Sequence, residues 1–168
     1  DGIRPRATLS GDGVEIVLDR QLLLVVRGGT ERTILNTSTG NREEYTSTSG
    51  NRAIAVTPKG TFKVYRGVDG PLTNSLGQLW RPRFFYRGIA VHGSPNIPAN
   101  PASHGCARVT NSAMDMIWAS GVMAIGTPAT AQAVMATMPS GGVSRPNDCV
   151  ITTITPRCTG WIPTATAS

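Results

Sequence analysis

Alternating apolar and polar residues, interrupted by turn-forming residues, constrain the fold of this sequence more than any other feature. Residues 14–18 alternate, Asp19-Arg20 favour a turn, and residues 21–26 form an apolar run that stops before Gly28-Gly29. A period of two is that of a β-strand with one buried face, so this region predicts a β-hairpin. Further strands are predicted over residues 30–37, 61–65 and 89–92.

Two other segments fit a strand less simply. Residues 41–52 are polar and predict either a long loop or an irregular hairpin. Residues 79–86 are rich in aromatic side chains but contain Pro82. Because proline has no N–H to donate, a strand there must lie at a sheet edge or contain a bulge.

One segment predicts a helix with both ends marked. Thr110 is a suitable N-cap, residues 111–120 follow it, and Gly121 is a suitable stop. Ala113, Met116, Ile117 and Ser120 are expected to lie on one face of this helix. A further strand is predicted over residues 122–125, and no strand is predicted after residue 128. The sequence therefore predicts a mainly β fold with one helix.

Composition agrees with a single domain of this kind. The chain has 168 residues, of which only 15% are charged, with 19 Gly and 12 Pro, which argues against long surface helices and coiled coils. Residues 116–144 carry no charge, but Gly and Pro interrupt them, so no membrane span is expected. The N-terminus has no basic segment followed by an apolar one, so a signal peptide is either absent or removed.

Charge and cysteine content restrict the class of partner and the compartment. The net charge of +6 comes from basic residues dispersed along the chain, which argues against nucleic-acid binding and favours a polyanionic surface such as a bacterial envelope. Among the three cysteines, Cys149 and Cys158 are close in the C-terminal segment and are predicted to form a disulfide, leaving Cys106 free. The alternative is three reduced thiols in a cytosolic protein.

Residues that carry chemistry are concentrated in one short region. The two histidines, His92 and His104, lie within fifteen residues of Cys106. A cysteine nucleophile needs a base, hydrogen-bond donors for an oxyanion and a backbone that a carbonyl can approach, and Ser103-His104-Gly105-Cys106 offers these parts. Gly105 would let its own amide and that of Cys106 point together at the oxyanion. A zinc site made by His92, His104 and Cys106 is the competing interpretation, although it offers only three ligands.

These residues resemble the YkuD-type L,D-transpeptidase catalytic domain, a family that remodels bacterial peptidoglycan. The resemblance rests on His92-Gly93, on Ser103-His104-Gly105-Cys106 with Arg108 two residues later, and on four further segments in the family's order. Those segments are the hairpin 16–26, Ser38-Thr39-Gly40, the Thr-Pro-x-Gly-x-Phe segment 57–62, and Gly126-Thr127-Pro128. Together they cover about residues 13–128.

The resemblance implies a β-sandwich with one helix after the catalytic cysteine segment. It implies a catalytic domain over 1–128 and a C-terminal extension over 129–168, packed on that domain or trailing it. In a two-step acyl transfer, Cys106 would be the nucleophile and His92 the base, oriented by the Gly93 carbonyl. His104 would act with the amides of Gly105 and Cys106 on the oxyanion. Residues assigned to substrate binding are Ser103, Gly105 and Arg108; the alternative for Arg108 is a solvated surface side chain.

The same resemblance implies partners and a location. Peptidoglycan stem peptides would be the substrates and a carbapenem-type β-lactam a covalent inhibitor, with no metal, cofactor or nucleic acid required. The protein would act outside the cytoplasmic membrane. Two alternatives stay open: an L,D-carboxypeptidase that uses water as acceptor, and a non-catalytic module that binds the cell wall. The sequence predicts no oligomeric state.

Overall fold

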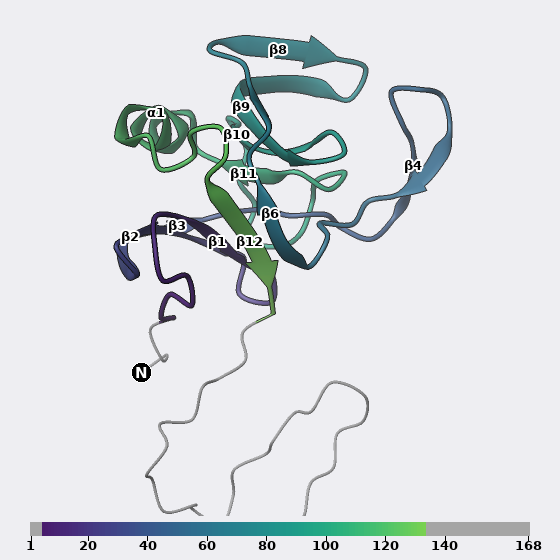
Figure 1. Cartoon of the computed structure of the whole chain (residues 1–168). Coiled ribbons are helices and arrows are strands. Elements are labelled where there is room, and N and C mark those ends of the chain that lie inside the picture. Colours follow the sequence, from purple (N-terminus) through teal and green to yellow (C-terminus); the bar gives the residue numbers. More distant parts are fainter. Residues whose placement is uncertain (1–4, 134–168) are drawn as a thin grey trace, which may run out of the picture. The chain divides into compact units, whose positions relative to one another are not determined.

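The computed structural model describes residues 5–133, which form two main sheets, a small separate hairpin and one helix (Figure 1). The first sheet has the strand order β3 (Thr30–Asn36), β2 (Leu22–Arg27), β1 (Gly13–Val17), β12 (Pro128–Gln132) and β6 (Gly60–Lys63). The second sheet has the order β11 (Ala107–Val109), β10 (Ile89–Gly93), β9 (Gly77–Tyr86) and β7 (Arg66–Gly67), with β8 (Pro71–Asn74) also paired to β9. The prediction of a mainly β fold with one helix is confirmed.

The first sheet is built on the predicted hairpin. β1 and β2 pair antiparallel, and β2 pairs in the same way with β3. β12 lies between β1, to which it is parallel, and β6, to which it is antiparallel. This interior strand was not predicted, because its sequence Pro-Ala-Thr-Ala-Gln lacks the large apolar residues that mark a buried strand. Residues 129–132, which the predicted division assigns to the C-terminal extension, are thus part of the sheet.

The second sheet is organised around β9, which pairs on both sides. Its register with β10 shifts opposite the segment that contains Pro82, so the bulge expected for this proline is present. β9 has neighbours on both sides, so it is not an edge strand. β10 and β11 are parallel, and the connection between them spans residues 94–106. Two parallel neighbours need such a crossover connection, and here it returns the chain beside β10 at Cys106.

The main core lies between the two sheets and the helix. It combines residues of the first sheet with residues of the second sheet and of α1 (Asn111–Ser120). Among its fully buried members are Val14, Ile16, Leu23, Val91, Val109, Met114 and Ile117. Burying side chains of this size stabilises the fold by about 1.5–3 kcal/mol each. β10 and β11, the strands of the candidate site, are therefore anchored by the packed core.

The helix begins and ends at the predicted residues. The Thr110 side chain accepts a hydrogen bond from the Ala113 amide, and Gly121 ends the helix with a left-handed φ of 71°. In the helix, Ile117 and Met114 are buried, whereas Ala113, Met116 and Ser120 are only partly buried. One expectation for the segment after the helix is wrong. Residues 122–125 form turns and not a strand; their apolar character comes from Val122 and Met123, which enter the core.

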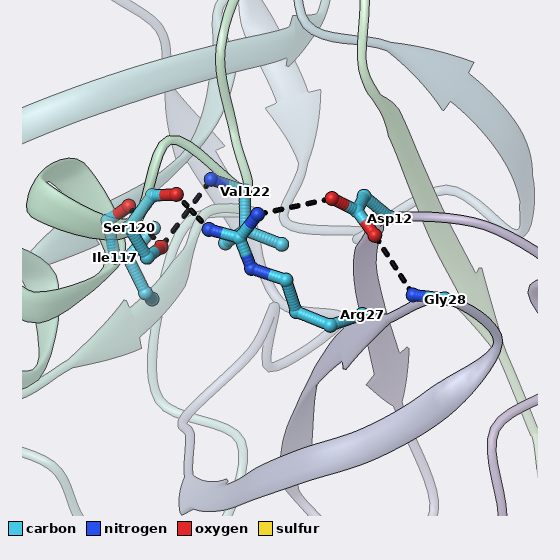
Figure 2. Close-up of polar contacts among 6 residues, drawn as sticks. All are labelled: Asp12, Arg27, Gly28, Ile117, Ser120 and Val122. Atoms are coloured by element: carbon cyan, nitrogen blue, oxygen red, sulfur yellow. Dashed lines mark hydrogen bonds and ion pairs between the residues drawn. The ribbon is translucent and has the colours of Figure 1, made fainter.

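Arg27 of β2 joins the first sheet to the end of this helix (Figure 2). The guanidinium donates to the Ser120 carbonyl oxygen and pairs with Asp12, with 3.0 Å between Nη1 and Oδ2. The other oxygen of Asp12 accepts from the Gly28 amide at 2.8 Å. The last turn of α1 has no basic residue of its own, so Arg27 supplies the positive charge that a helix C-terminus favours.

The segment for which a loop or an irregular hairpin was predicted forms a hairpin. Its strands β4 (Glu44–Thr46) and β5 (Arg52–Ile54) pair antiparallel as a separate two-stranded sheet (Figure 1). Within residues 5–133, no helix is long and apolar enough to cross a membrane. The predicted Cys149–Cys158 disulfide lies outside the described residues.

Candidate active site

Two adjacent strands place the expected catalytic residues on one face of the second sheet. In the parallel register of β10 and β11, His92 lies opposite Arg108, while the residues preceding each of them belong to the core. Successive strand residues point to opposite faces, so His92 and Arg108 point together away from that core. Cys106 directly precedes β11, and its Sγ accepts a hydrogen bond from the Ala90 amide of β10 at 3.4 Å. The thiol therefore lies against the strand that carries His92.

The backbone determines which nitrogen of His92 can act as a base. Nδ1 lies 2.9 Å from the carbonyl oxygen of Gly93. A carbonyl only accepts, so Nδ1 carries the hydrogen of the neutral ring and Nε2 keeps its lone pair. Gly93 also has to be glycine here, since a Cβ would lie 2.7 Å from Asn111 Oδ1. The strand end thus holds His92 in the tautomer that a general base requires.

Burial makes both members of this pair neutral. It lowers the pKa of His92 to about 4, although the hydrogen bond to Gly93 opposes this shift. Burial likewise raises the pKa of the Cys106 thiol, against the lowering effects of the Ala90 amide and the Arg108 charge. At neutral pH the site therefore holds a thiol and a neutral imidazole. Proton transfer to His92 would then accompany attack by sulfur, without a preformed ion pair.

The loop before Cys106 is closed by one serine side chain. Ser103 is only 2% exposed. Its Oγ donates to the Cys106 carbonyl oxygen at 2.5 Å and accepts from the Gly105 amide at 3.0 Å. Gly105 has a φ of 131°, a conformation that side chains rarely adopt. The Gly105 amide is thus occupied, whereas the Cys106 amide has no acceptor within residues 5–133.

His104 lies in the loop before Cys106, whereas Arg108 lies in β11. His104 is exposed, and its ring lies against Tyr45 of β4, with centroids 4.8 Å apart. Arg108 is partly buried, and its positive charge lowers the pKa values of both His92 and Cys106. None of the ion pairs within residues 5–133 includes Arg108. The charge of Arg108 beside His92 and Cys106 is therefore not paired with a carboxylate of the described residues.

Residues 37–40 frame the loop from both ends, a role that sequence reasoning missed. Ser38 exchanges backbone hydrogen bonds with Arg108, and the Thr39 carbonyl accepts from the Ser103 amide at 2.9 Å. The Ser38 hydroxyl also donates to the Asn100 carbonyl oxygen at 2.8 Å. The signal in the sequence was a cluster of Ser and Thr before a glycine, a composition that also occurs in ordinary turns.

A second residue that sequence reasoning passed over is Thr57, in the Thr-Pro-x-Gly-x-Phe segment. Its hydroxyl donates to the Gly105 carbonyl oxygen at 2.6 Å and accepts from the Gly40 amide at 3.0 Å. Thr57 also lines a cavity of about 680 Å³ between residues 18–21, 39–42 and 99–101. Neither His92 nor Cys106 lines this cavity.

The geometry gives the zinc interpretation no support. Within the described part of the chain, no three His, Cys, Asp or Glu side chains approach closely enough to hold a metal ion. The reason is visible at His104, whose ring stacks on Tyr45, and at His92, whose Nδ1 is bound to the backbone. What the arrangement offers is a thiol, a neutral base with one free nitrogen and an unoccupied backbone amide.

Known structures share this architecture. An L,D-transpeptidase crystal structure from Xylanimonas cellulosilytica is 47% identical with a TM-score of 0.72, over 77% of this chain and 64% of that one. The catalytic domain of the E. faecium L,D-transpeptidase is 21% identical with a TM-score of 0.55, over 74% of this chain and 99% of that one. L,D-transpeptidase 3 from Mycobacterium tuberculosis, solved with a faropenem-derived adduct, is 17% identical with a TM-score of 0.55, over 73% and 60%. The latter two likenesses concern the fold alone.

The comparisons also set the extent of the match. The chain spans less than two thirds of the Xylanimonas cellulosilytica chain. No curated protein sequence matches it. The family model described as the L,D-transpeptidase catalytic domain, YkuD, matches residues 11–130 and so includes both strands and the loop of the candidate site. This chain belongs to the YkuD family of L,D-transpeptidase catalytic domains.

Proposed function

We propose that this chain is a peptidoglycan L,D-transpeptidase that uses Cys106 as an acyl-transfer nucleophile. The observation that carries the proposal is the hydrogen bond from His92 Nδ1 to the Gly93 carbonyl on β10, the strand that also contacts the Cys106 thiol. It leaves Nε2 of a neutral imidazole as the base beside a neutral thiol. Membership of the YkuD family and the 47% identical L,D-transpeptidase support the same chemistry.

In the first step, the Cys106 sulfur attacks the carbonyl of the third stem residue, at the bond to the terminal D-Ala. His92 Nε2 takes the thiol proton as the S–C bond forms, and then gives it to the D-Ala amine as the C–N bond breaks. The product is a thioester on Cys106 and free D-Ala. Because the imidazole is neutral before and after this step, the step leaves the net charge of the site unchanged.

In the second step, the third-residue side-chain amine of another stem attacks the thioester. His92 accepts a proton from that amine and returns it to the departing sulfur, which restores the thiol. One amide bond has then replaced another, so the reaction balances with the groups of this site. Water in place of the amine would give the alternative L,D-carboxypeptidase reaction.

The structure suggests distinct tasks for the loop residues. The Cys106 amide is the unoccupied donor for the oxyanion, and His104 is the nearby side chain expected to assist it. Ser103 is buried and satisfied on both sides, so we assign it to the shape of the loop in place of the predicted substrate contact. Gly105 supplies the left-handed backbone, and Arg108 is assigned to a stem carboxylate, which a guanidinium binds well.

The proposal extends to inhibitors, to location and to the ends of the chain. Carbapenem-type β-lactams would acylate Cys106, in line with relatives solved with a faropenem-derived adduct and with imipenem. Acting on the cell wall places the protein outside the cytoplasmic membrane, where a Cys149–Cys158 disulfide can form. A catalytic domain followed by a C-terminal extension stays the proposed organisation, although β12 continues the sheet to Gln132.

Product masses test the proposal against its alternatives. The protein is incubated with a purified disaccharide-tetrapeptide, and the products are compared with those of Cys106→Ala. A transpeptidase gives a cross-linked dimer and free D-Ala, whereas a carboxypeptidase gives a tripeptide and D-Ala without dimer. Binding to sacculi with no Cys106-dependent product would leave the wall-binding module as the better description.

A further inference from the structure

Thr57 lies outside the catalytic pair, yet its hydroxyl connects three segments of the site. The side chain is buried, with 5% of its surface exposed. Its Oγ1 lies 2.6 Å from the Gly105 carbonyl oxygen and 3.0 Å from the Gly40 amide nitrogen. The Gly40 N–H donates to Oγ1, so the single hydroxyl proton is directed to the Gly105 carbonyl. The contact to the loop is therefore a hydrogen bond of fixed direction.

The direction of this hydrogen bond also affects where the Cys106 N–H points. In a trans peptide the carbonyl oxygen and the N–H lie in the same plane and point in opposite directions. The Gly105 carbonyl belongs to the same peptide unit as the Cys106 N–H, so holding the former toward Thr57 aims the latter away from it. That N–H has no acceptor within residues 5–133, while the Gly105 N–H is occupied by Ser103. The orientation of the Gly105–Cys106 peptide thus determines where the unoccupied Cys106 N–H points.

The backbone segments that the Thr57 hydroxyl connects approach one another closely. A Cβ on Gly40 would lie 2.3 Å from the Ala55 carbonyl oxygen, and a Cβ on Gly105 would lie 3.0 Å from that of Val56. Both glycines therefore let their segments approach the chain immediately before Thr57. The segments that the Thr57 hydroxyl connects are therefore closely packed at this point.

We propose that Thr57 is a positioning residue for the oxyanion: its hydroxyl fixes the Gly105–Cys106 peptide so that the Cys106 N–H faces the developing negative charge. This inference rests on the proposed acyl transfer at Cys106. It assigns to Thr57 an effect on transition states that contain an oxyanion, and none on the reactivity of the thiol itself.

Two reactions of the same sulfur separate these effects. Opening of a β-lactam such as imipenem passes through a tetrahedral oxyanion and uses the Cys106 amide. Alkylation by iodoacetamide forms an S–C bond at a saturated carbon and expels iodide, while the thiol proton leaves, so no oxyanion develops. A general disturbance of the loop would slow both reactions, whereas a misdirected amide slows only the first.

The experiment measures both rate constants by intact mass for wild type, Thr57→Val and Thr57→Ser. Thr130→Val is the matched control, because Thr130 is also buried and its hydroxyl contacts Thr61 in the first sheet. We expect Thr57→Val to lower the acylation rate constant by about tenfold or more, since small misplacements of a catalytic group have effects of this size. Its alkylation rate should stay within about twofold, Thr57→Ser should restore acylation, and Thr130→Val should match wild type.

Other results would overturn the inference. Unchanged acylation in Thr57→Val, or an equal loss of acylation and alkylation, removes the oxyanion role of Thr57. If Thr57→Val does not fold, Thr57→Ala carries the same expectation and the same contrary outcomes. Failure of wild type to be acylated, while iodoacetamide still modifies Cys106, overturns the proposed function and this inference with it.

Discussion

His92 and Cys106 reach the same site by different structural means. His92 lies inside β10, where pairing with β9 and β11 fixes the backbone and the adjacent Gly93 carbonyl fixes the ring. Cys106 ends a loop whose conformation is held by side-chain hydrogen bonds. The Ser103 hydroxyl donates to the Cys106 carbonyl, and the Thr57 hydroxyl donates to the Gly105 carbonyl. The hydrogen bonds of a strand ladder join backbone groups, so they do not depend on one side chain. The loop before Cys106 depends on side-chain hydroxyls, so the loss of one of them should change its conformation. We therefore expect changes around Cys106 to alter geometry, and changes around His92 to alter proton transfer.

The largest effect should follow removal of the nucleophile. Cys106→Ala leaves no sulfur to attack, so acylation by a carbapenem should be lost completely while the fold is retained. Intact mass after incubation with imipenem measures this, and circular dichroism provides the control for folding. An adduct of the same mass on Cys106→Ala would place the nucleophile elsewhere.

Removal of the base should come next. In His92→Gln a polar side chain of similar size remains on β10 but cannot accept the thiol proton. We expect the acylation rate constant to fall by about 10²–10⁴-fold, the range found for general bases. A rate within threefold of wild type, on a protein of unchanged thermal stability, would contradict the assignment of His92.

The pH dependence of acylation tests the buried, neutral state of this pair. The pKa of His92 is lowered to about 4 by burial, so the base stays unprotonated until the pH falls to that value. We expect the rate to be nearly constant from pH 7 to 5 and to fall about tenfold per pH unit below 4. Stability should also decline as the pH falls from about 6.5 toward 4, because the unfolded chain takes up the proton first.

A stopped-flow or quenched-flow pH series on wild type supplies this profile. A loss of acylation with a midpoint near 6.5 would mean that His92 titrates as it does in water. The contrast drawn between His92 and Cys106 would then fail, because β10 would not be shielding the imidazole from water.

Ser103→Ala tests the loop side of the comparison. The change leaves the Gly105 amide and the Cys106 carbonyl without their partner, which should lower the free energy of unfolding by about 1–2 kcal/mol. We expect acylation to slow by about tenfold as the loop loses its shape. Ser112→Ala, at an exposed serine of α1, is the control that should change neither quantity. Wild-type acylation in Ser103→Ala would show that the loop keeps its geometry by other contacts.

The smallest effect on catalysis should come from the far end of the helix. Arg27→Gln removes the contact with the Ser120 carbonyl and the ion pair with Asp12 (Figure 2). Because Arg27 is partly exposed, we expect a loss of only about 0.5–1 kcal/mol in the free energy of unfolding. Acylation should be unchanged, and thermal unfolding with a parallel rate measurement checks both. Slower acylation at equal stability would couple this contact to the site.

The part of the fold that could be predicted is the part that local sequence determines. Thr110 and Gly121 mark the helix because capping depends on one side chain and one glycine. The hairpin of β1 and β2 follows from alternation and a turn. The site residues could be proposed from the sequence because much of their chemistry lies within four consecutive positions, Ser103 to Cys106.

The rest depends on contacts that no local pattern contains. β12 is a strand because β1 and β6 hold it on both sides, although its own residues are small and polar. Residues 122–125 are apolar because the side chains of Val122 and Met123 enter the core. A short apolar run in the sequence does not distinguish such a buried turn from a strand. Thr57 meets Gly105 across 48 positions of the chain. Its role becomes visible only when the three segments are brought together.

The most direct test of Cys106 as the acyl-transfer nucleophile is the mass of the protein during turnover of its proposed substrate. Wild type is mixed with a disaccharide-tetrapeptide, quenched in acid within the first turnover and measured intact. We predict a tripeptidyl thioester on wild type, absent from Cys106→Ala and matched by released D-Ala. A folded wild-type protein that remains unmodified and releases no D-Ala would contradict the proposal.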